Sequence, residues 1–375
     1  SILVYNDEDI IPAMIHCGIE KEDAFTYTMH GCNWPDIPGK ERPVGGCHLS
    51  LPHHFYKAFM AGDEPKSIDE LYERFTLSIR DNIDRSFSDI RHRRQDWDKH
   101  APGGLKIDDC FHDGPVANAR SWGLGGVKYS TLLSSIRFIG TTADCFSAVD
   151  DLVFRSKKTS INELRRTLEN DFAENESLRQ LCLNAPKYGQ DNDLADGHAI
   201  RILEAVTREF DRASELGTDD VVIAMRCLTT DMGHRGEGAS LGATPDGRHA
   251  RQPFSDNTSP YPGSCTKGIT AMFRSIAKLP LNRFNSGALN VRIQRKFVFD
   301  DHGLERLMAL LRTFFNMGGM QVQLSVADTN ELRSAQINPE AHRDLMVRIT
   351  GYSAVFIDMC KSAQDEIIRR EEMEG

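Results

Sequence analysis

The sequence predicts an α/β fold, and two recurring patterns lead to this prediction. Amphipathic segments with apolar residues at every third or fourth position are typical of helices and recur along the chain. Between them lie strand-like segments, of which MQVQLSV at 320–326 alternates most clearly. Helices that interleave with strands favour a sheet covered by helices, so the expected class is α/β.

The first and longest predicted helix spans 65–100. Its apolar side chains recur at threes and fours, and Ser67 with Glu70 has the pattern of a capping box. Gly318 and Gly319 end the predicted helix at 303–317, and ITGYSAV at 349–355 separates the predicted helices at 340–349 and 359–373. The further predicted helices are 142–157, 159–182, 195–215, 303–317, 340–349 and 359–373.

Composition and charge exclude several classes of protein. The 375 residues include 45 Lys and Arg against 55 Asp and Glu, a net charge of −10. This acidic balance argues against a protein that binds nucleic acid or an anionic membrane. No apolar run reaches the roughly 18 residues of a transmembrane helix, and the N-terminus has no signal-peptide pattern. The chain begins with Ser rather than Met, as a processed chain or a fragment does.

The cysteines point to a reducing compartment. There are 9 of them, spread along the chain without a CxxC pair. This spacing predicts free thiols and no metal site, and together with the missing signal sequence it predicts a cytoplasmic protein. Gly-rich loops at 123–126, 184–193 and 242–248 are tight connections or functional loops. The last, GATPDGR, lacks the GK[ST] ending of a phosphate-binding loop.

Two segments carry candidate chemistry. The first, MHGCNWPDIPGKE at 29–41, places Cys32 after a glycine on a predicted loop. Cys32 is either a buried structural thiol, the commonest fate of cysteine, or a reactive group that reaches into a cavity. The second, around Gly351, surrounds one glycine with Ile349, Tyr352 and Val355. That glycine is either a turn residue or the site of a backbone radical, which a glycine forms without side-chain strain.

The motifs resemble those of the pyruvate formate-lyase-like superfamily of glycyl radical enzymes. RITGYSA followed by QDEIIRR resembles the glycyl radical signature. LNAPKYGQDND, GATPDGR, SIAKLP, FFNMGGMQVQLSV and RDLMVRITGYSA occur in the same order as in that family. The resemblance therefore covers nearly the whole chain.

The resemblance implies a role for each of the two residues. Gly351 would store the radical, and Cys32 would become the thiyl that abstracts hydrogen from a small organic substrate. Because the two bonds to hydrogen are similar in strength, the hydrogen can move between them reversibly. No cofactor would be bound, and the radical would be installed by a separate activating enzyme that uses S-adenosylmethionine and an iron–sulfur cluster.

The resemblance also implies an architecture. Family members are ten-stranded α/β barrels made of two half-barrels, with the Cys loop and the Gly loop meeting in the interior. Residues 1–246 would be the C-terminal part of the pyruvate formate-lyase-like domain, and residues 247–375 the glycine radical domain. Cys32 lies so near the start that this chain resembles only the second half. The first half-barrel would come from the same or a separate chain, and a homodimer is a further expectation.

The residues after Cys32 depart from the family pattern. The eliminases read Gly-Cys-x-Glu, with the Glu as acid or base, whereas Asn33 and Trp34 follow Cys32 here. Asn33 also breaks the adjacent-cysteine pattern of pyruvate formate-lyase itself. Asp36 is either a replacement base or an exposed loop carboxylate, and Trp34 either borders the substrate or pins the loop. With Asn285, these residues are the candidate substrate-binding set.

The predicted function is a radical lyase-type reaction, whether dehydration, decarboxylation, C–C, C–N or C–S cleavage, or fumarate addition; a formate acetyltransferase-like reaction is the remaining enzyme class. One alternative is an inactive relative or a spare-part subunit that restores the Gly loop of another enzyme. The retention of Cys32 counts against it. A second alternative, which needs no resemblance, is a thiol hydrolase that uses Cys32 and a histidine.

Overall fold

The computed structural model describes residues 2–29, 34–100, 104–215, 222–229, 233–294, 298–299, 301–348, 353–361, 363–365 and 367–368. Its centre is a four-stranded parallel sheet in the order β4-β5-β6-β7. A bulge between Pro43 and Gly45 interrupts the first strand pair. The strands are β4 (Glu41–Ser50), β5 (Tyr129–Arg137), β6 (Val222–Leu228) and β7 (Ser286–Gly287).

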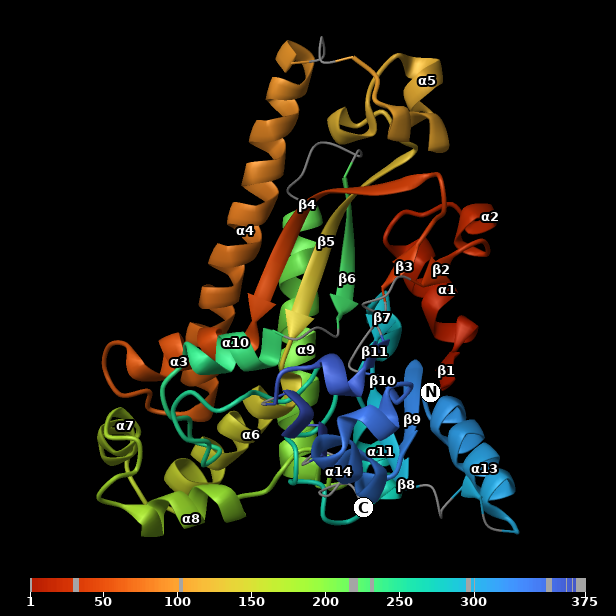
Figure 1. The fold of residues 1–375 in the computed structure, drawn as a ribbon. Coiled ribbons are helices and arrows are strands. Elements are labelled where there is room, and N and C mark those ends of the chain that lie inside the picture. Colours follow the sequence, from red (N-terminus) through yellow and green to blue (C-terminus); the bar gives the residue numbers. More distant parts are fainter. Residues whose placement is uncertain are drawn as a thin grey trace.

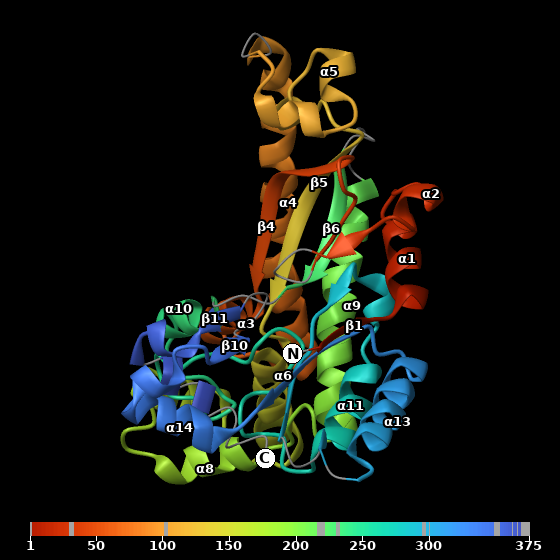
Figure 2. The same ribbon diagram turned by 45° about the vertical axis from the view of Figure 1, so that its right-hand side comes forward.

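Two long helices lie side by side on one face of this sheet (Figures 1 and 2). They are α4 (Ile68–His100) and α9 (Asp193–Glu215). The Cys47 thiol of β4 contacts Asn82 of α4, and the Arg226 guanidinium of β6 lies over the Phe210 ring of α9. Side chains that alternate with these along the strands therefore lie on the opposite face of the sheet.

A second sheet has the order β1-β9-β8, with β1 antiparallel and β8 parallel to the central strand. Its strands are β1 (Ile2–Tyr5), β8 (Asn290–Gln294) and β9 (Gln321–Ala327). The remaining helices are α1 (Asp7–His16), α2 (Lys21–Ala24), α3 (Leu51–Met60), α5 (Pro115–Asn118), α6 (Ile139–Val149), α7 (Ile161–Glu169), α8 (Glu176–Asn184), α10 (Gly233–Ala239), α11 (Ile269–Ala277), α13 (Gly303–Asn316) and α14 (Thr329–Ile337).

Two short antiparallel hairpins stand apart from these sheets. They consist of β2 (Thr28–Met29) with β3 (Pro35–Asp36), and of β10 (Met346–Arg348) with β11 (Ser353–Val355). Most buried apolar residues form one core cluster between the sheets and helices. The second hairpin belongs to a separate small cluster that includes Val347, Phe356 and Ile368. No helix among the described residues has an apolar stretch long enough to cross a membrane.

Several predicted elements are confirmed. Helices 65–100, 195–215 and 303–317 correspond to α4, α9 and α13, and strand 320–326 corresponds to β9. The Ser67 hydroxyl accepts the backbone N–H of Glu70, as predicted for the start of α4. The predicted helix 142–157 begins as α6 and continues as a π-helical turn at Asp150–Arg155.

Two predictions were wrong. The single helix at 159–182 is two helices, α7 and α8, because Asp171 and Phe172 have positive φ angles of 50° and 62° and end the first one. The predicted helix at 340–349 is a short 3-10 turn, Pro339–His342, followed by strand β10. Of the predicted helix 359–373, residues 359 and 360 are described and are not helical, whereas residues 361, 363–365 and 367–368 are described and are helical.

Candidate active site

Cys32 and Asn33 lie outside the described residues, but the backbone on both sides of them is held in place. Met29 pairs with Pro35, and Thr28 pairs with Asp36. The segment with the predicted thiyl residue thus connects two paired strands. Asp36 lies in the second of these strands, four residues after Cys32 in the sequence.

Gly351 also lies outside the described residues, and it too connects two paired strands. Arg348 pairs with Ser353, and Val347 pairs with Ala354. Beyond β11, the Gln364 amide donates hydrogen bonds to the carbonyls of Phe356 and Met359 at 2.9 and 3.1 Å. This amide therefore holds the turn that follows the predicted radical hairpin.

Trp34 directly follows the Cys32 segment. It is partly buried, and its ring packs against the main hydrophobic core. This packing attaches Trp34, the first described residue after the loop, to the core. Only the exposed part of the Trp34 side chain is accessible to a substrate.

Asn285 is fully buried and directly precedes β7. Its amide oxygen accepts the backbone N–H of Arg226 at 2.8 Å and the thiol of Cys17 at 3.3 Å. The amide nitrogen has no hydrogen-bond partner among the described residues. A buried unpaired donor is costly, so this N–H₂ is the group of Asn285 that is suited to bind a ligand or a water molecule.

Asp36 is not the exposed loop carboxylate that the sequence suggested. It is half-buried in β3, and its side chain is hydrogen-bonded to that of Glu41, at the start of β4. Glu41 is only 7% exposed, and the hydroxyl of Thr131 donates a hydrogen bond to its Oε1. Burial first, and the bond with Asp36 second, raise the pKa of Glu41 far above its ordinary range.

Two cations flank Glu41 in sequence, but both are used elsewhere. The Lys40 ammonium lies 2.6 Å from Asp23. Arg42 donates from Nε to His112 at 2.9 Å, and its guanidinium lies 5.0 Å from the centre of the Trp122 ring. Within the described part of the chain Glu41 forms no ion pair, and the charge of Arg42 lowers its pKa by less than burial raises it. Sequence analysis did not single out Glu41, because its burial depends on residues that are distant in sequence, such as Thr131.

Asp23 binds two lysine side chains near this site. It accepts hydrogen bonds from Lys40, from Lys128 at 2.7 Å and from the Tyr129 hydroxyl at 2.7 Å. These three bonds hold the pKa of Asp23 well below its ordinary range. Since Asp23 lies in α2 and Tyr129 in β5, the cluster ties the segment that precedes the Cys32 hairpin to the central sheet.

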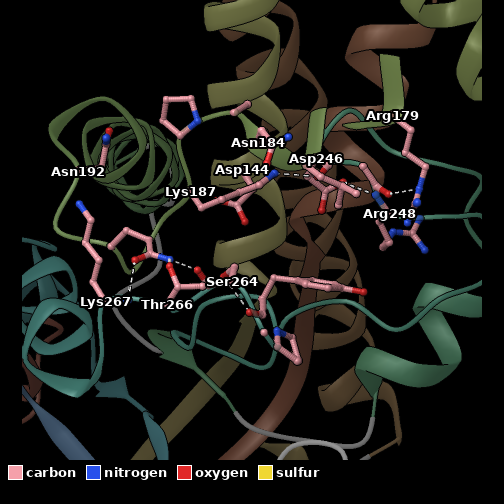
Figure 3. Close-up of a pocket in the computed structure, with 18 of the residues that line it drawn as sticks. Asp144, Arg179, Asn184, Lys187, Asn192, Asp246, Arg248, Ser264, Thr266 and Lys267 are labelled. Carbon is pink, nitrogen blue, oxygen red and sulfur yellow. Dashed lines mark hydrogen bonds between the residues drawn. The ribbon is translucent and has the colours of Figure 1, made fainter. Parts of the chain in front are cut away.

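A separate cavity of about 600 Å³ lies among the Gly-rich loops (Figure 3). Lys187, from the NAPKYGQDND segment, donates to the carbonyls of Cys182 and Asp246 at 2.9 and 2.7 Å. Arg248, from GATPDGR, donates to the carbonyls of Gly242 and Gln252. Because both cations bind backbone carbonyls, these loops are held together by them and do not form a phosphate cradle.

Asp144 lines the same cavity from helix α6 (Figure 3). One carboxyl oxygen accepts the backbone N–H of Tyr188 at 2.7 Å, and the other has no hydrogen-bond partner among the described residues. Burial raises the pKa of Asp144 to about 7. No three His, Cys, Asp or Glu side chains gather in the described part of the chain so as to hold a metal ion.

Two protein families match the chain. Residues 1–231 match the family described as pyruvate formate lyase-like, and residues 254–357 match the family described as glycine radical. The first range includes Cys32 and the second includes Gly351.

Enzymes of known activity are similar to this chain over nearly its whole length. The trans-4-hydroxy-L-proline dehydratase of Clostridioides difficile is 31% identical over 98% of this chain and 48% of its own length. The isethionate sulfite-lyase of Oleidesulfovibrio alaskensis is 27% identical over 97% of this chain and 46% of its own length. The chain thus spans about half the length of the curated relatives it matches.

A solved structure shares the fold. The glycerol-bound form of the B12-independent glycerol dehydratase from Clostridium butyricum superposes with a TM-score of 0.87 at 30% identity. The match covers 99% of this chain and 48% of that chain. A structure of a protein from Roseburia inulinivorans, described for 1,2-propanediol dehydration, gives a TM-score of 0.86 at 28% identity.

Proposed function

Because this chain belongs to the pyruvate formate lyase-like family, we propose that it carries both radical residues of a glycyl radical enzyme. The observation that supports this proposal most directly is the presence of both matched regions in one chain, the first around Cys32 and the second around Gly351. Each of these residues lies in the connection of a two-stranded hairpin whose strands are paired on both sides.

The proposed chemistry is hydrogen-atom transfer between three partners. Gly351 stores the unpaired electron on its α-carbon. Cys32 gives its thiol hydrogen to that carbon and becomes a thiyl, which then takes a hydrogen atom from the substrate. The thiol returns hydrogen to the product radical, and the radical goes back to Gly351. No bound cofactor takes part in this cycle; S-adenosylmethionine and an iron–sulfur cluster act only in the activating enzyme.

We propose a radical elimination on a small organic substrate. The relatives include dehydratases and a sulfite-lyase, which remove water or sulfite. The candidate residues beside the substrate are Trp34, Asn33, Asp36 and Asn285. An elimination needs a group that moves protons, and the carboxylate of the Gly-Cys-x-Glu pattern is absent after Cys32.

The rest of the enzyme would complete the active site. The chain matches about half of its relatives, and the proposed architecture is the second half of a ten-stranded barrel, with residues 1–246 and 247–375 as its two domains. The first half-barrel would close the site from the same or another chain. The proposed partners are an activating enzyme of the radical S-adenosylmethionine type and a second copy, in the cytoplasm.

The test is anaerobic electron paramagnetic resonance of the protein together with its remaining half, the activating enzyme, a reductant and S-adenosylmethionine. The expected signal is a doublet, from coupling to the one α-hydrogen left on the radical glycine. Gly351→Ala should remove the doublet. Cys32→Ala should keep it and abolish turnover of glycerol, propane-1,2-diol, isethionate and trans-4-hydroxy-L-proline.

Two results would contradict the proposal. If no doublet forms while the activating enzyme modifies its own verified target, the chain is an inactive relative. If the Cys32→Ala protein still turns over one of the four compounds, another residue must abstract the hydrogen.

A further inference from the structure

The cavity among the Gly-rich loops is built from four segments of the chain (Figure 3). Helix α6 contributes Asp144, and the stretch from α8 into the NAPKYGQDND loop contributes Arg179 and Lys187. The other two segments are the GATPDGR loop and residues 261–267. The volume of about 600 Å³ is in the range of small-molecule sites. No described residue of β2, β3, β10 or β11 lines this cavity, so it is separate from the two hairpins of the proposed radical site.

The lining of the cavity is positively charged, although the chain as a whole has a net charge of −10. Among the described residues, four cationic side chains line it against two carboxyls; they are Arg179, Lys187, Arg248 and Lys267, with Asp144 and Asp246. Lys187 and Arg248 bind backbone carbonyls, which orient these two cations without neutralising their charge. A concave site with an excess of positive charge attracts anions.

Two of the four cations keep donors that no other group uses. The Lys267 side chain is exposed, and its ammonium has no hydrogen-bond or ion-pair partner in the described part of the chain. Arg179 donates from Nε to the Gly247 carbonyl at 3.0 Å and from Nη1 to Glu176 at 3.1 Å, which leaves its Nη2 for a ligand. Figure 3 shows Lys267 at one end of the cavity and Arg179 at the other, with Lys187 between them.

The segment that carries Lys267 is attached to the wall of the cavity by Gln190, which is only 9% exposed. The Gln190 amide donates from Nε2 to the Ser264 carbonyl, and its Oε1 accepts the backbone N–H of Lys267 at 3.0 Å. The free ammonium of Lys267 therefore starts from a fixed backbone position. This attachment reduces the conformational entropy that is lost when a ligand binds.

We propose that this cavity binds a small dicarboxylate, with one carboxylate held by Lys267 and the other by Arg179. Two cationic side chains at opposite ends suit two carboxylates joined by a short carbon chain, and the charge of Lys187 lies between them. Inorganic phosphate fits less well, because the loops do not form a phosphate cradle. This site goes beyond the proposed radical chemistry, and its test needs no radical.

The test is isothermal titration calorimetry of the full, non-activated enzyme at pH 8. The ionic strength is kept constant, because salt screens contacts between exposed charges. The probes are malonate, succinate and glutarate, with butyrate as the monocarboxylate and inorganic phosphate as the compact anion. At least one dicarboxylate should bind about 10-fold or more tightly than butyrate and phosphate, the value of a hydrogen bond between charged groups.

Three variants test the two ends of the cavity. Lys267→Met and Arg179→Met should each remove the preference for the dicarboxylate, because each leaves one carboxylate without its cation. Lys158→Met changes an exposed lysine that does not line the cavity, so it is the matched control and should keep the preference.

A change at Asp144 tests the charge argument in the opposite direction. At pH 8 this carboxyl is largely ionised, since its pKa is about 7, and its charge repels the ligand. Asp144→Asn keeps an oxygen for the N–H of Tyr188 and removes the charge. The variant should therefore bind the preferred dicarboxylate several-fold more tightly than the parent does.

A second measurement uses the unmodified sequence. The preferred dicarboxylate should slow the acetylation of Lys267 by acetic anhydride, measured by peptide mass spectrometry, and leave the acetylation of Lys158 unchanged. Equal acetylation of Lys267 with and without ligand would overturn the proposal, as would equal affinities for dicarboxylates and butyrate. Weaker binding in Asp144→Asn would also overturn it. Loss of binding in Cys32→Ala would place the ligand in the radical site and would equally contradict the proposal.

Discussion

Asp144 allows a quantitative prediction about the pH dependence of stability. This carboxyl is fully buried in α6, where it accepts the N–H of Tyr188 and leaves its second oxygen without a partner among the described residues. Burial raises its pKa from 3.8 to about 7. In Asp144→Asn, the amide oxygen keeps the bond to Tyr188, and the amide N–H₂ replaces the hydroxyl of the protonated acid. The variant therefore resembles the protonated form at every pH.

The magnitude follows from linkage between protonation and folding. Because the pKa is higher in the folded protein, the folded state binds the proton more tightly than the unfolded state does. The stabilising contribution is complete below about pH 4 and is lost as the pH rises to about 7. The rise in pKa corresponds to about 4 kcal/mol. The free energy of unfolding of Asp144→Asn relative to the parent should therefore increase by about 4 kcal/mol over this range and then level off.

The assay is urea unfolding of both proteins at several pH values, followed by tryptophan fluorescence. Asp89→Asn, at an exposed position of α4, is the control and should show no such change with pH. A difference between Asp144→Asn and the parent that stays constant with pH would refute the reasoning. It would mean that the Asp144 carboxyl is already ionised in the folded protein near pH 4.

The remaining predictions concern an ion pair, a motif glycine and the radical itself. Lys278→Met should lower the free energy of unfolding by about 3–5 kcal/mol, because the Asp196 carboxylate is 1% exposed and loses the ammonium that lies 2.8 Å from it. Adding Asp196→Asn should restore most of the lost free energy of unfolding. If urea unfolding shows no such recovery in the double variant, this explanation is wrong. Gly189→Ala should lower the free energy of unfolding by about 2 kcal/mol, since φ at Gly189 is 88° and an added Cβ would lie 2.2 Å from Pro260. Gly197 of α9 has open space where a Cβ would be added, so Gly197→Ala should raise the free energy of unfolding by up to about 1 kcal/mol. Equal effects in both would argue against this account of the NAPKYGQDND loop. Air should cleave the activated protein at Gly351, and an intact mass after aeration would speak against a radical there.

The sequence was sufficient for the features that depend on neighbouring residues. The amphipathic spacing of α4, α9 and α13 and the alternation in β9 are local patterns, and the structure confirms them. The motif around Gly351 and the motifs LNAPKYGQDND, GATPDGR and FFNMGGMQVQLSV are also short and contiguous, and they pointed to the family that the comparisons identify. The parallel strands β4, β5 and β6 were not predicted. Nearly every side chain of β5 is buried, so β5 lacks the alternation that marks a half-exposed strand. In β4, Pro43 and two glycines weaken the strand pattern.

The sequence by itself determined the family, the class of fold and the two residues proposed to carry the radical, since each depends on the order of residues along the chain. Only the tertiary structure decided what surrounds a buried carboxyl group such as that of Glu41. Glu41 meets Thr131, which is 90 positions away in sequence, while the lysine and the arginine that flank it are drawn to Asp23 and His112. The charge of a buried side chain is set by what surrounds it in space, and the chain's neighbours in sequence are a poor guide to that.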